Sequence, residues 1–385
     1  DGTVLADASG NGHAGAFGEL VNGVVAGDIA MPGQQADYTF TLTGRTRLLF
    51  DSLTNNSNIV WRLRGPGGVS IIGDRSFTSS DSYDGSSVLD LAAGDYTLTV
   101  DGLVDATGPF EFRLLPLDAV AEPLPLNTRV DAELSPSAST AVYGFHGDAG
   151  QRIYLDAIAR TAGDIYWRLV DPDGRVVFGP SVMNNSTNDA ELTLAKTGDY
   201  TLLIEGRYYI GGNTRFGFAV HTVVDQTATL TLDTDVTGTL AMPGQRDRHT
   251  FTLANDGVVY FDAMTNDSRM RWSLTGPRGT VIDGRSFTAS DSYELGGSPV
   301  LALVAGDYTL TIDGDGDDAG AYAFRLHDLS AATSIDFDEI VTGRLAPGSA
   351  TRIYSFEAGA YDRLRFDMLT ESRDSASWRL LDPWK

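Results

Sequence analysis

The chain contains no cysteine among its 385 residues, so disulfide bonds, thiolate chemistry and cysteine-based metal sites are excluded. No run of apolar residues is long enough to span a bilayer as a helix. The sequence also lacks the G-x-S-x-G, H-E-x-x-H and phosphate-loop motifs of common enzymes. We therefore predict that this chain is not an enzyme and does not insert into a membrane.

Positive charge is scarce in this sequence. Lys and Arg together number 28 against 52 Asp and Glu, which gives a net charge of −24. Such an acidic surface repels nucleic-acid phosphates and anionic lipid headgroups, so we predict no nucleic acid among the partners. Apolar residues make up 42% of the chain and glycine contributes 43 residues. This composition supports packed cores built from strands that tight turns connect.

An internal repeat dominates the sequence. Similar segments, such as "IVWRLRGP" and "IYWRLVDP", place tryptophans at intervals of 106, 105 and 106 residues, namely Trp61, Trp167, Trp272 and Trp378. An aspartate closes the preceding strand of each copy, at Asp51, Asp156, Asp262 and Asp367. A "GDY" motif begins a late strand in three copies, at Gly94, Gly198 and Gly306. The chain is therefore an array of modules of about 105 residues.

Two repeat types alternate along this array. Copies one and three share "AMPGQ", at Ala30 and Ala241, and the loops "RSFTSSDSY" and "RSFTASDSY". Copies two and four share "WRLxDP" instead. We call the first pair type A and the second pair type B. The two types together form a superperiod of 211 residues, measured from Trp61 to Trp272.

Apolar residues within a repeat alternate with a period of two, as in "YTFTL", where Tyr38, Phe40 and Leu42 share one face. This alternation predicts strands with one buried face. About eight such strands fit in each repeat, with turn signals every 8–12 residues, as expected for a β-sandwich. We predict an all-β chain of tandem β-sandwich repeats, either jelly-roll or immunoglobulin-like, with no helix longer than a turn.

The repeats divide the chain into five parts. We expect residues 1–20 to be a linker or the remnant of a preceding domain. The β-sandwich repeats are expected at 21–117, 118–222 and 223–328. Residues 329–385 are the first half of a fourth repeat, because the sequence ends before another "GDY". This half repeat leaves Trp378 and its neighbours without the opposing sheet.

The order of elements within a repeat carries a family resemblance. The opening Tyr38–Phe40 strand, "WRLVDPDG", "AGDYTLTV" and the closing aromatic strand "FEFRLLPL" resemble the bacterial pre-peptidase C-terminal domain. This resemblance implies β-sandwich accessory or binding modules of secreted bacterial proteins, which are not catalytic and some of which bind calcium. Near the N-terminus, "DASGNGHAG" resembles the start of a laminin-G-like domain. It favours a large extracellular parent protein.

Aromatic residues offer both core and binding interpretations. Each repeat tryptophan is in phase with inward aliphatic residues, so we predict core packing rather than a glycan platform. His249 occupies the position of Tyr38 in copy one, and we interpret it as a core substitution. Tyr208 and Tyr209 lie in "EGRYYIGGN", a loop of copy two alone, and are the better glycan candidates. The alternative is that this loop packs on its own sandwich.

Calcium is the predicted cofactor. The segment "TIDGDGDDAGAY" carries four aspartates in a glycine-containing loop, Asp313, Asp315, Asp317 and Asp318. Hard oxygen ligands at such spacing suit Ca²⁺, although the loop departs from the EF-hand pattern. The alternative interpretation is a solvated acidic turn. For the aspartates of the "GDY" turns and of the strand ends, we expect capping of their own backbone.

The "RSFTSSDSY" and "RSFTASDSY" loops are nearly identical, whereas loops ordinarily drift. We therefore predict ligand-binding roles for Asp81, Tyr83, Asp291 and Tyr293. Recent duplication is the alternative explanation, because "AMPGQ" is retained in the same two copies.

These features predict a non-catalytic structural or extender segment of a large secreted or cell-surface bacterial protein, such as an adhesin or a surface assembly. The alternatives are a carbohydrate- or surface-binding module, which repetition would strengthen by avidity, and an accessory tail of an exported hydrolase. The expected partners are a glycan or neighbouring copies of the same protein. The expected location is extracellular, at the bacterial cell surface or in the medium.

Overall fold

The computed structural model describes residues 4–5, 15–16, 23–80, 88–161, 164–184, 190–290, 300–316, 318–369 and 377–381. These residues are mainly β-strands, and the one α-helix among them, α2 (Leu117–Val120), has four residues. No described helix is long and apolar enough to cross a membrane. The predicted all-β fold class of tandem β-sandwiches is confirmed.

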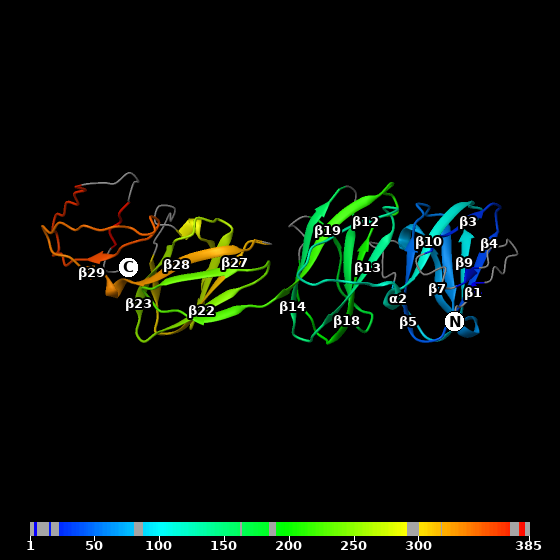
Figure 1. Ribbon diagram of the computed structural model, residues 1–385, viewed down its shortest axis with the longest axis horizontal. Helices are drawn as coiled ribbons and strands as arrows, with labels where there is room; N and C mark the ends of the chain where they lie inside the picture. The colour runs from blue at the N-terminus through cyan, green and yellow to red at the C-terminus, as the bar shows by residue number, and fades with distance from the viewer. Residues whose placement is uncertain are drawn as a thin grey trace. The chain divides into compact units, whose positions relative to one another are not determined.

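Repeat 1 is a sandwich of two antiparallel sheets, drawn in blue to cyan in Figure 1. One sheet has the order β3-β10-β5-β8 and the other the order β4-β9-β6-β7. The strands are β3 (Val25–Ile29), β4 (Gln35–Leu42), β5 (Thr46–Ser52), β6 (Ile59–Arg64), β7 (Ser70–Ser76), β8 (Val88–Leu91), β9 (Gly94–Gly102) and β10 (Gly108–Pro116).

Repeats 2 and 3 have the same two-sheet arrangement. Repeat 2 contains β12 (Val130–Leu134), β13 (Thr140–Gly147), β14 (Arg152–Arg160), β15 (Tyr166–Val170), β16 (Val176–Val182), β17 (Ala190–Thr193), β18 (Gly198–Glu205) and β19 (Thr214–Val223). Repeat 3 contains β21 (Asp235–Leu240), β22 (Asp247–Leu253), β23 (Gly257–Ala263), β24 (Met270–Gly276), β25 (Gly279–Ser286), β26 (Val300–Leu303), β27 (Gly306–Gly314) and β28 (Gly320–Asp328).

The strand order identifies the sandwich as a jelly roll. When the strands of each repeat are numbered one to eight, one sheet reads 1-8-3-6 and the other 2-7-4-5 in all three repeats. This is the double Greek-key order of a jelly roll. Of the two topologies left open by the sequence, the structure therefore has the jelly roll.

The segments that join the repeats form short parallel edge strands. β11 (Glu122–Pro123) pairs with β13, β20 (Gln226–Thr229) pairs with β22, and β29 (Thr333–Ser334) pairs with β30 (Tyr354–Ser355). The joining segments are thus held to the repeat that follows them by backbone hydrogen bonds.

The chain separates into two compact units, Asp1–Thr222 and Val223–Lys385. The first unit contains repeats 1 and 2, and the second contains repeat 3 and the residues of repeat 4. Each unit therefore consists of one type A segment followed by one type B segment.

The core of each of repeats 1, 2 and 3 is centred on its tryptophan, as predicted. The ring of Trp61 stacks on Phe50 and that of Trp272 stacks on Phe261, with 4.0 Å between ring centroids in both cases. Trp167 is fully buried in repeat 2. These three side chains are interior packing groups, so they offer no face to a glycan.

The "GDY" motif makes a tight corner in each repeat. Gly306 has φ +141°, and a Cβ there would lie 2.3 Å from Pro277 Cγ, so a side chain does not fit. Gly94 and Gly198 have the same conformation against Pro66 and Pro172. The next tyrosine of each motif folds back and donates to a carbonyl four residues upstream, as Tyr308 Oη does to Val304 O at 2.8 Å. This is the geometry of a tyrosine corner.

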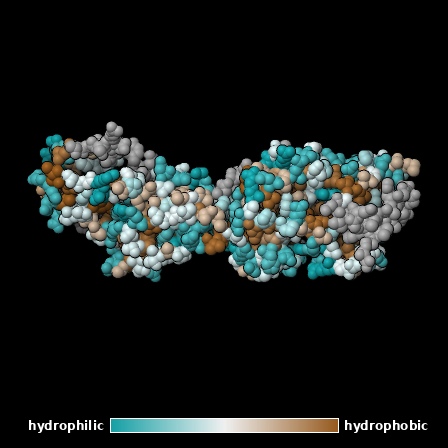
Figure 2. All heavy atoms as spheres, in the orientation of Figure 1, coloured by the Kyte–Doolittle hydropathy of each residue, from teal (hydrophilic) through white to brown (hydrophobic). Residues whose placement is uncertain are grey.

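The described part of repeat 4 has little regular structure. The regular elements between residues 329 and 369 are the one-turn 3-10 helix η4 (Leu329–Ala331) and the two-residue strands β29 and β30. Large apolar side chains there are exposed, as Figure 2 shows at the left of the view. Trp378 is 60% exposed and Leu380 is 62% exposed. The ring centroid of Trp378 lies 5.7 Å from that of Phe366. Trp378 therefore does not lie in a sandwich core.

Candidate functional site: the junction between repeats 1 and 2

Three aspartates of the predicted calcium loop form ion pairs with arginines of the same repeat. Asp313 accepts from Arg246 Nε at 3.0 Å, Asp315 from Arg271 Nη2 at 2.7 Å and Asp318 from Arg269 Nη1 at 2.7 Å. The hydrogen bond from Arg271 holds the pKa of Asp315 below its ordinary value. Within the described ranges, no group of three or more His, Asp or Glu side chains is placed to hold a metal. Asp317 lies outside those ranges, and the calcium site stays a prediction.

Tyr208 and Tyr209 belong to a cluster around one arginine. The guanidinium of Arg207 lies 5.3 to 5.4 Å from the ring centroids of Tyr166, Tyr208 and Tyr209. Tyr209 is 45% exposed and its hydroxyl donates to Asp164 at 2.9 Å. The loop therefore packs on its own sandwich, as the alternative interpretation holds, and it leaves one aromatic ring accessible.

The retained "RSFT" loops have a structural role in their first half. Trp61 Nε1 donates to Ser80 Oγ at 2.6 Å, and Trp272 Nε1 donates to Ser290 Oγ at 2.7 Å. Both serines lie in one-turn 3-10 helices, η2 (Thr78–Ser80) and η3 (Thr288–Ser290). This hydrogen bond explains the retained serine. The predicted ligand residues Asp81, Tyr83, Asp291 and Tyr293 lie outside the described residues.

The "GDY" aspartates were expected to cap their own backbone. Instead, their side chains bond across the sheet to the neighbouring strand. Asp95 accepts from Thr41 Oγ1 at 2.6 Å, and Asp307 accepts from Thr252 Oγ1 at the same distance. Asp199 Oδ1 lies 2.9 Å from His146 Nδ1. These contacts tie the second and seventh strands of each jelly roll together.

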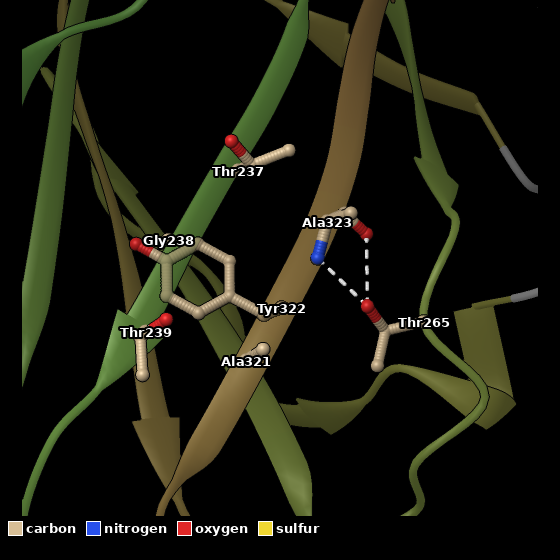
Figure 3. A pocket seen from close by; sticks show the side chains of 7 residues that line it. All are labelled: Thr237, Gly238, Thr239, Thr265, Ala321, Tyr322 and Ala323. Carbon is tan, nitrogen blue, oxygen red and sulfur yellow. Dashed lines mark hydrogen bonds between the residues drawn. The ribbon is translucent and has the colours of Figure 1, made fainter.

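A shallow hollow lies on the surface of repeat 3, over β21 and β28, and Figure 3 shows its lining. Thr265 lines one side of the hollow, and its hydroxyl accepts a hydrogen bond from the Ala323 amide at 2.7 Å. The other lining side chains are small, and the ring of Tyr322 lies against Gly238. The hydroxyls of Thr265 and Tyr322 are hydrogen-bonded within repeat 3 itself.

The most strongly built feature outside the cores is the junction of repeats 1 and 2. Alternation along β5 and β10 directs Phe50 and Leu114 into the core and their neighbours outward. The outward side chains form a separate apolar cluster with those of repeat 2, and each member is at most 6% exposed: Leu49, Leu115, Leu117, Val142, Val170 and Leu203. Complete burial of such side chains stabilises the folded state by about 1.5–3 kcal/mol each.

A polar network lies beside this apolar cluster. The Thr140 hydroxyl donates to Asp51 Oδ1 at 2.8 Å across the junction. Arg113 Nε donates to Asp51 Oδ2 at 2.7 Å, and its Nη2 donates to the Thr140 carbonyl at 2.8 Å. Asp51 is 5% exposed. The strand-end aspartate of repeat 1 therefore binds the next repeat, where backbone capping was expected.

Two further polar contacts border the junction. Arg168 and Glu205 of repeat 2 form an ion pair at 3.2 Å, with side chains 1% and 3% exposed. They share the outward faces of β15 and β18 with Val170 and Leu203. Arg47 of repeat 1 donates to the Asp171 carbonyl at 3.0 Å. Removing one partner of a buried ion pair costs about 3–5 kcal/mol, so the Arg168–Glu205 pair stabilises repeat 2 itself, whereas the Arg47 hydrogen bond crosses the junction.

Sequence reasoning identified Asp51 but not its partners. Thr140 is unremarkable in a strand, and nothing local marks it as an interface residue. The available signal was that a threonine recurs 211 residues later, at Thr351, at the corresponding position of the other type B segment.

Comparisons with known proteins do not assign this chain to a family. No protein-family model matches the chain, and no curated protein matches it. Among solved structures, the CUB1-EGF-CUB2 domain of human MASP-1/3 is 9% identical, with a TM-score of 0.17, over 52% of this chain and 100% of that one. A chain in the atomic structure of Sulfolobus turreted icosahedral virus is 11% identical in sequence, with the same TM-score of 0.17, over 85% of this chain and 90% of that one. At such low TM-scores these likenesses carry no argument.

Proposed function

We propose that this chain is a non-catalytic extender segment of a large secreted or cell-surface bacterial protein. The observation that carries the proposal is the buried junction of repeats 1 and 2, at which Leu49, Leu115 and Asp51 are withdrawn from solvent by the next repeat. Modules that serve only as separate binding domains need no such junction, whereas a segment that holds other domains at a distance does.

Other features support the same proposal. The net charge of −24 favours solubility. The joining segments are bonded into the following repeat by parallel strand pairs, so they are not free linkers. The resemblance to pre-peptidase C-terminal modules of secreted bacterial proteins supports the location.

Force spectroscopy of the full chain, held between two marker domains, tests the extender function. We expect separate unfolding events for repeats 1, 2 and 3, each releasing roughly 350 Å of chain, because about 105 extended residues span that length. Extension without force peaks would contradict the proposal, because an extender has to keep its length under load.

A second candidate function, glycan binding, rests on the exposed ring of Tyr209 beside Arg207. Aromatic rings of this kind serve as stacking surfaces for sugars, and Tyr combines an apolar ring with a polar hydroxyl. Screening the full chain and its Tyr209→Ala variant on a glycan array tests it. Binding that the variant loses would favour this function, and no binding by either protein would exclude it.

A further inference from the structure

The junction contact recurs 211 residues further along the chain. Thr351 Oγ1 of repeat 4 donates to Asp262 Oδ1 of repeat 3 at 2.9 Å, and the Thr351 amide donates to Asp262 Oδ2 at 2.8 Å. In the first unit, Thr140 makes the same two bonds to Asp51, at 2.8 and 3.4 Å. We call this pair of hydrogen bonds the aspartate–threonine clasp.

The clasp persists although its surroundings differ between the two units. The apolar Leu49 and Leu115 of repeat 1 are replaced by Tyr260 and His327 in repeat 3, and these two rings lie 6.3 Å apart. Arg325, the counterpart of the clasp arginine Arg113, bonds to Asp235 of its own repeat at 2.7 Å. The aspartate and the threonine are thus the shared part of both junctions.

The threonine side of the clasp belongs to type B repeats only. In type A repeats, the corresponding positions are Gln35 and Arg246. Their side chains are already bonded within their own repeats, Gln35 to Asp101 at 2.7 Å and Arg246 to Asp313 at 3.0 Å. A type A repeat therefore has no hydroxyl to offer at this position.

The aspartate side of the clasp is not confined to type A. Type B repeat 2 has an aspartate at the same position, Asp156, but Ala219 replaces the clasp arginine Arg113. The Asp156 carboxylate lies 3.4 Å from His221 of its own repeat. Asp262 of type A repeat 3 likewise lies beside a histidine, with 3.6 Å between its Oδ2 and His327 Nε2. The threonine therefore distinguishes the two repeat types, and the aspartate does not.

We propose that the outer sheet of each type A repeat, formed by β3-β10-β5-β8 and by β21-β28-β23-β26, is a docking surface selective for a type B repeat. The threonine of the clasp supplies the selectivity, and in the first unit an apolar cluster that includes Leu49 and Leu115 lies beside it. The A–B pair is then the building unit of the array, which gives the 211-residue superperiod a structural cause. This inference does not depend on the extender function, because the same pairing serves a binding array.

Hydrogen exchange of the full chain, read peptide by peptide, tests the pairing. Thr140→Val removes the hydroxyl donor of repeat 2, and we expect amides of β5 and β10 in repeat 1 to exchange about ten-fold faster, since a hydrogen bond to a charged group contributes at least that factor. Asp51→Asn changes the acceptor in repeat 1, and we expect it to make the amides of β13 in repeat 2 exchange faster. The double variant should exchange no faster than the more affected single variant, because both remove the same bond.

Matched variants make the test decisive. Thr140→Ser keeps the hydroxyl and should keep protection in repeat 1. Asp156→Ala removes the corresponding carboxylate of repeat 2 and should leave β5 and β10 unchanged. Thr351→Val should make the amides of β23 in repeat 3 exchange faster, as Thr140→Val does for repeat 1. Effects of Thr140→Val confined to repeat 2, or effects of the two single variants that multiply in the double variant, would overturn the proposal.

Discussion

The Nε2 atom of His249 lies 3.0 Å from the hydroxyl oxygen of Tyr322, which in turn donates to Asp247 Oδ2 at 2.7 Å. All three side chains are buried inside repeat 3. Repeat 1, the other type A repeat, has Ala36, Tyr38 and Phe110 at these positions. Two otherwise similar repeats therefore differ by a hydrogen-bonded polar chain in the core. The core interpretation of His249 is correct.

Acid is expected to destabilise repeat 3 selectively. Burial lowers the pKa of His249 below its ordinary value, so the folded repeat keeps this ring neutral while the unfolded chain takes up a proton near pH 6.5. The stability is present above that pH and is lost as pH falls below it, by up to about 1.4 kcal/mol per pH unit. Because the chain has no cysteine, thiol labelling of an Ala263→Cys variant measures unfolding of repeat 3 alone.

The control for this prediction is repeat 1. Ser52 corresponds to Ala263 and is buried as well, so a Ser52→Cys variant reports repeat 1, which has no histidine in its core. His249→Tyr in the Ala263→Cys background should abolish the dependence between pH 7 and 6. Equal dependence of the two repeats on pH would contradict the role of His249.

The serine that holds each type A tryptophan is expected to be important for stability. Ser80→Ala leaves the buried Trp61 Nε1 without its acceptor and should cost about 1–2 kcal/mol in the unfolding of repeat 1. Ser79→Ala is the matched control, because repeat 3 already has Ala289 there, and should stay within about 0.5 kcal/mol. Denaturant unfolding measures both, and equal costs would refute the explanation of the retained loop.

The corner glycine is expected to tolerate no side chain. Gly306→Ala forces a Cβ to within 2.3 Å of Pro277 Cγ at φ +141°, which should destabilise repeat 3 by about 3 kcal/mol. Gly257→Ala, at the start of β23, meets only a carbonyl oxygen at 4.0 Å and should change stability by less than about 0.5 kcal/mol. Labelling of the Ala263→Cys variant compares the two, and a harmless Gly306→Ala would show that the corner is adaptable.

Arginines bond to aspartate oxygens that the predicted calcium site would use in the acidic loop of repeat 3. Arg271→Gln frees the Asp315 carboxylate, so we expect calorimetry to give a calcium affinity roughly ten-fold higher than that of the unmodified chain, since ligand charge tunes these sites. Arg278→Gln removes a charge in an exposed turn and should have little effect. Absence of heat at about 1 mM calcium in all three proteins would end the calcium interpretation.

Sequence patterns predicted the strands well because burial along them alternates. Tyr38, Phe40 and Leu42 occupy one buried face of β4, as their spacing indicates. The junction could not be predicted in this way. Leu49 and Leu115 lie on the outer face, where alternation predicts solvent, and the cluster that they form with Leu117 and side chains of repeat 2 buries them.

The sequence by itself determined the repeat length, the alternation of two repeat types, the all-β class and the tryptophan-centred cores, because each follows from local periodicity and from residues that recur at fixed intervals. Only the tertiary structure decided the jelly-roll order and the partners of Asp51 and Asp262. Strand order and contacts between repeats depend on groups far apart in the chain, and the geometry that joins Asp51 to Thr140 exists only after both sandwiches have folded.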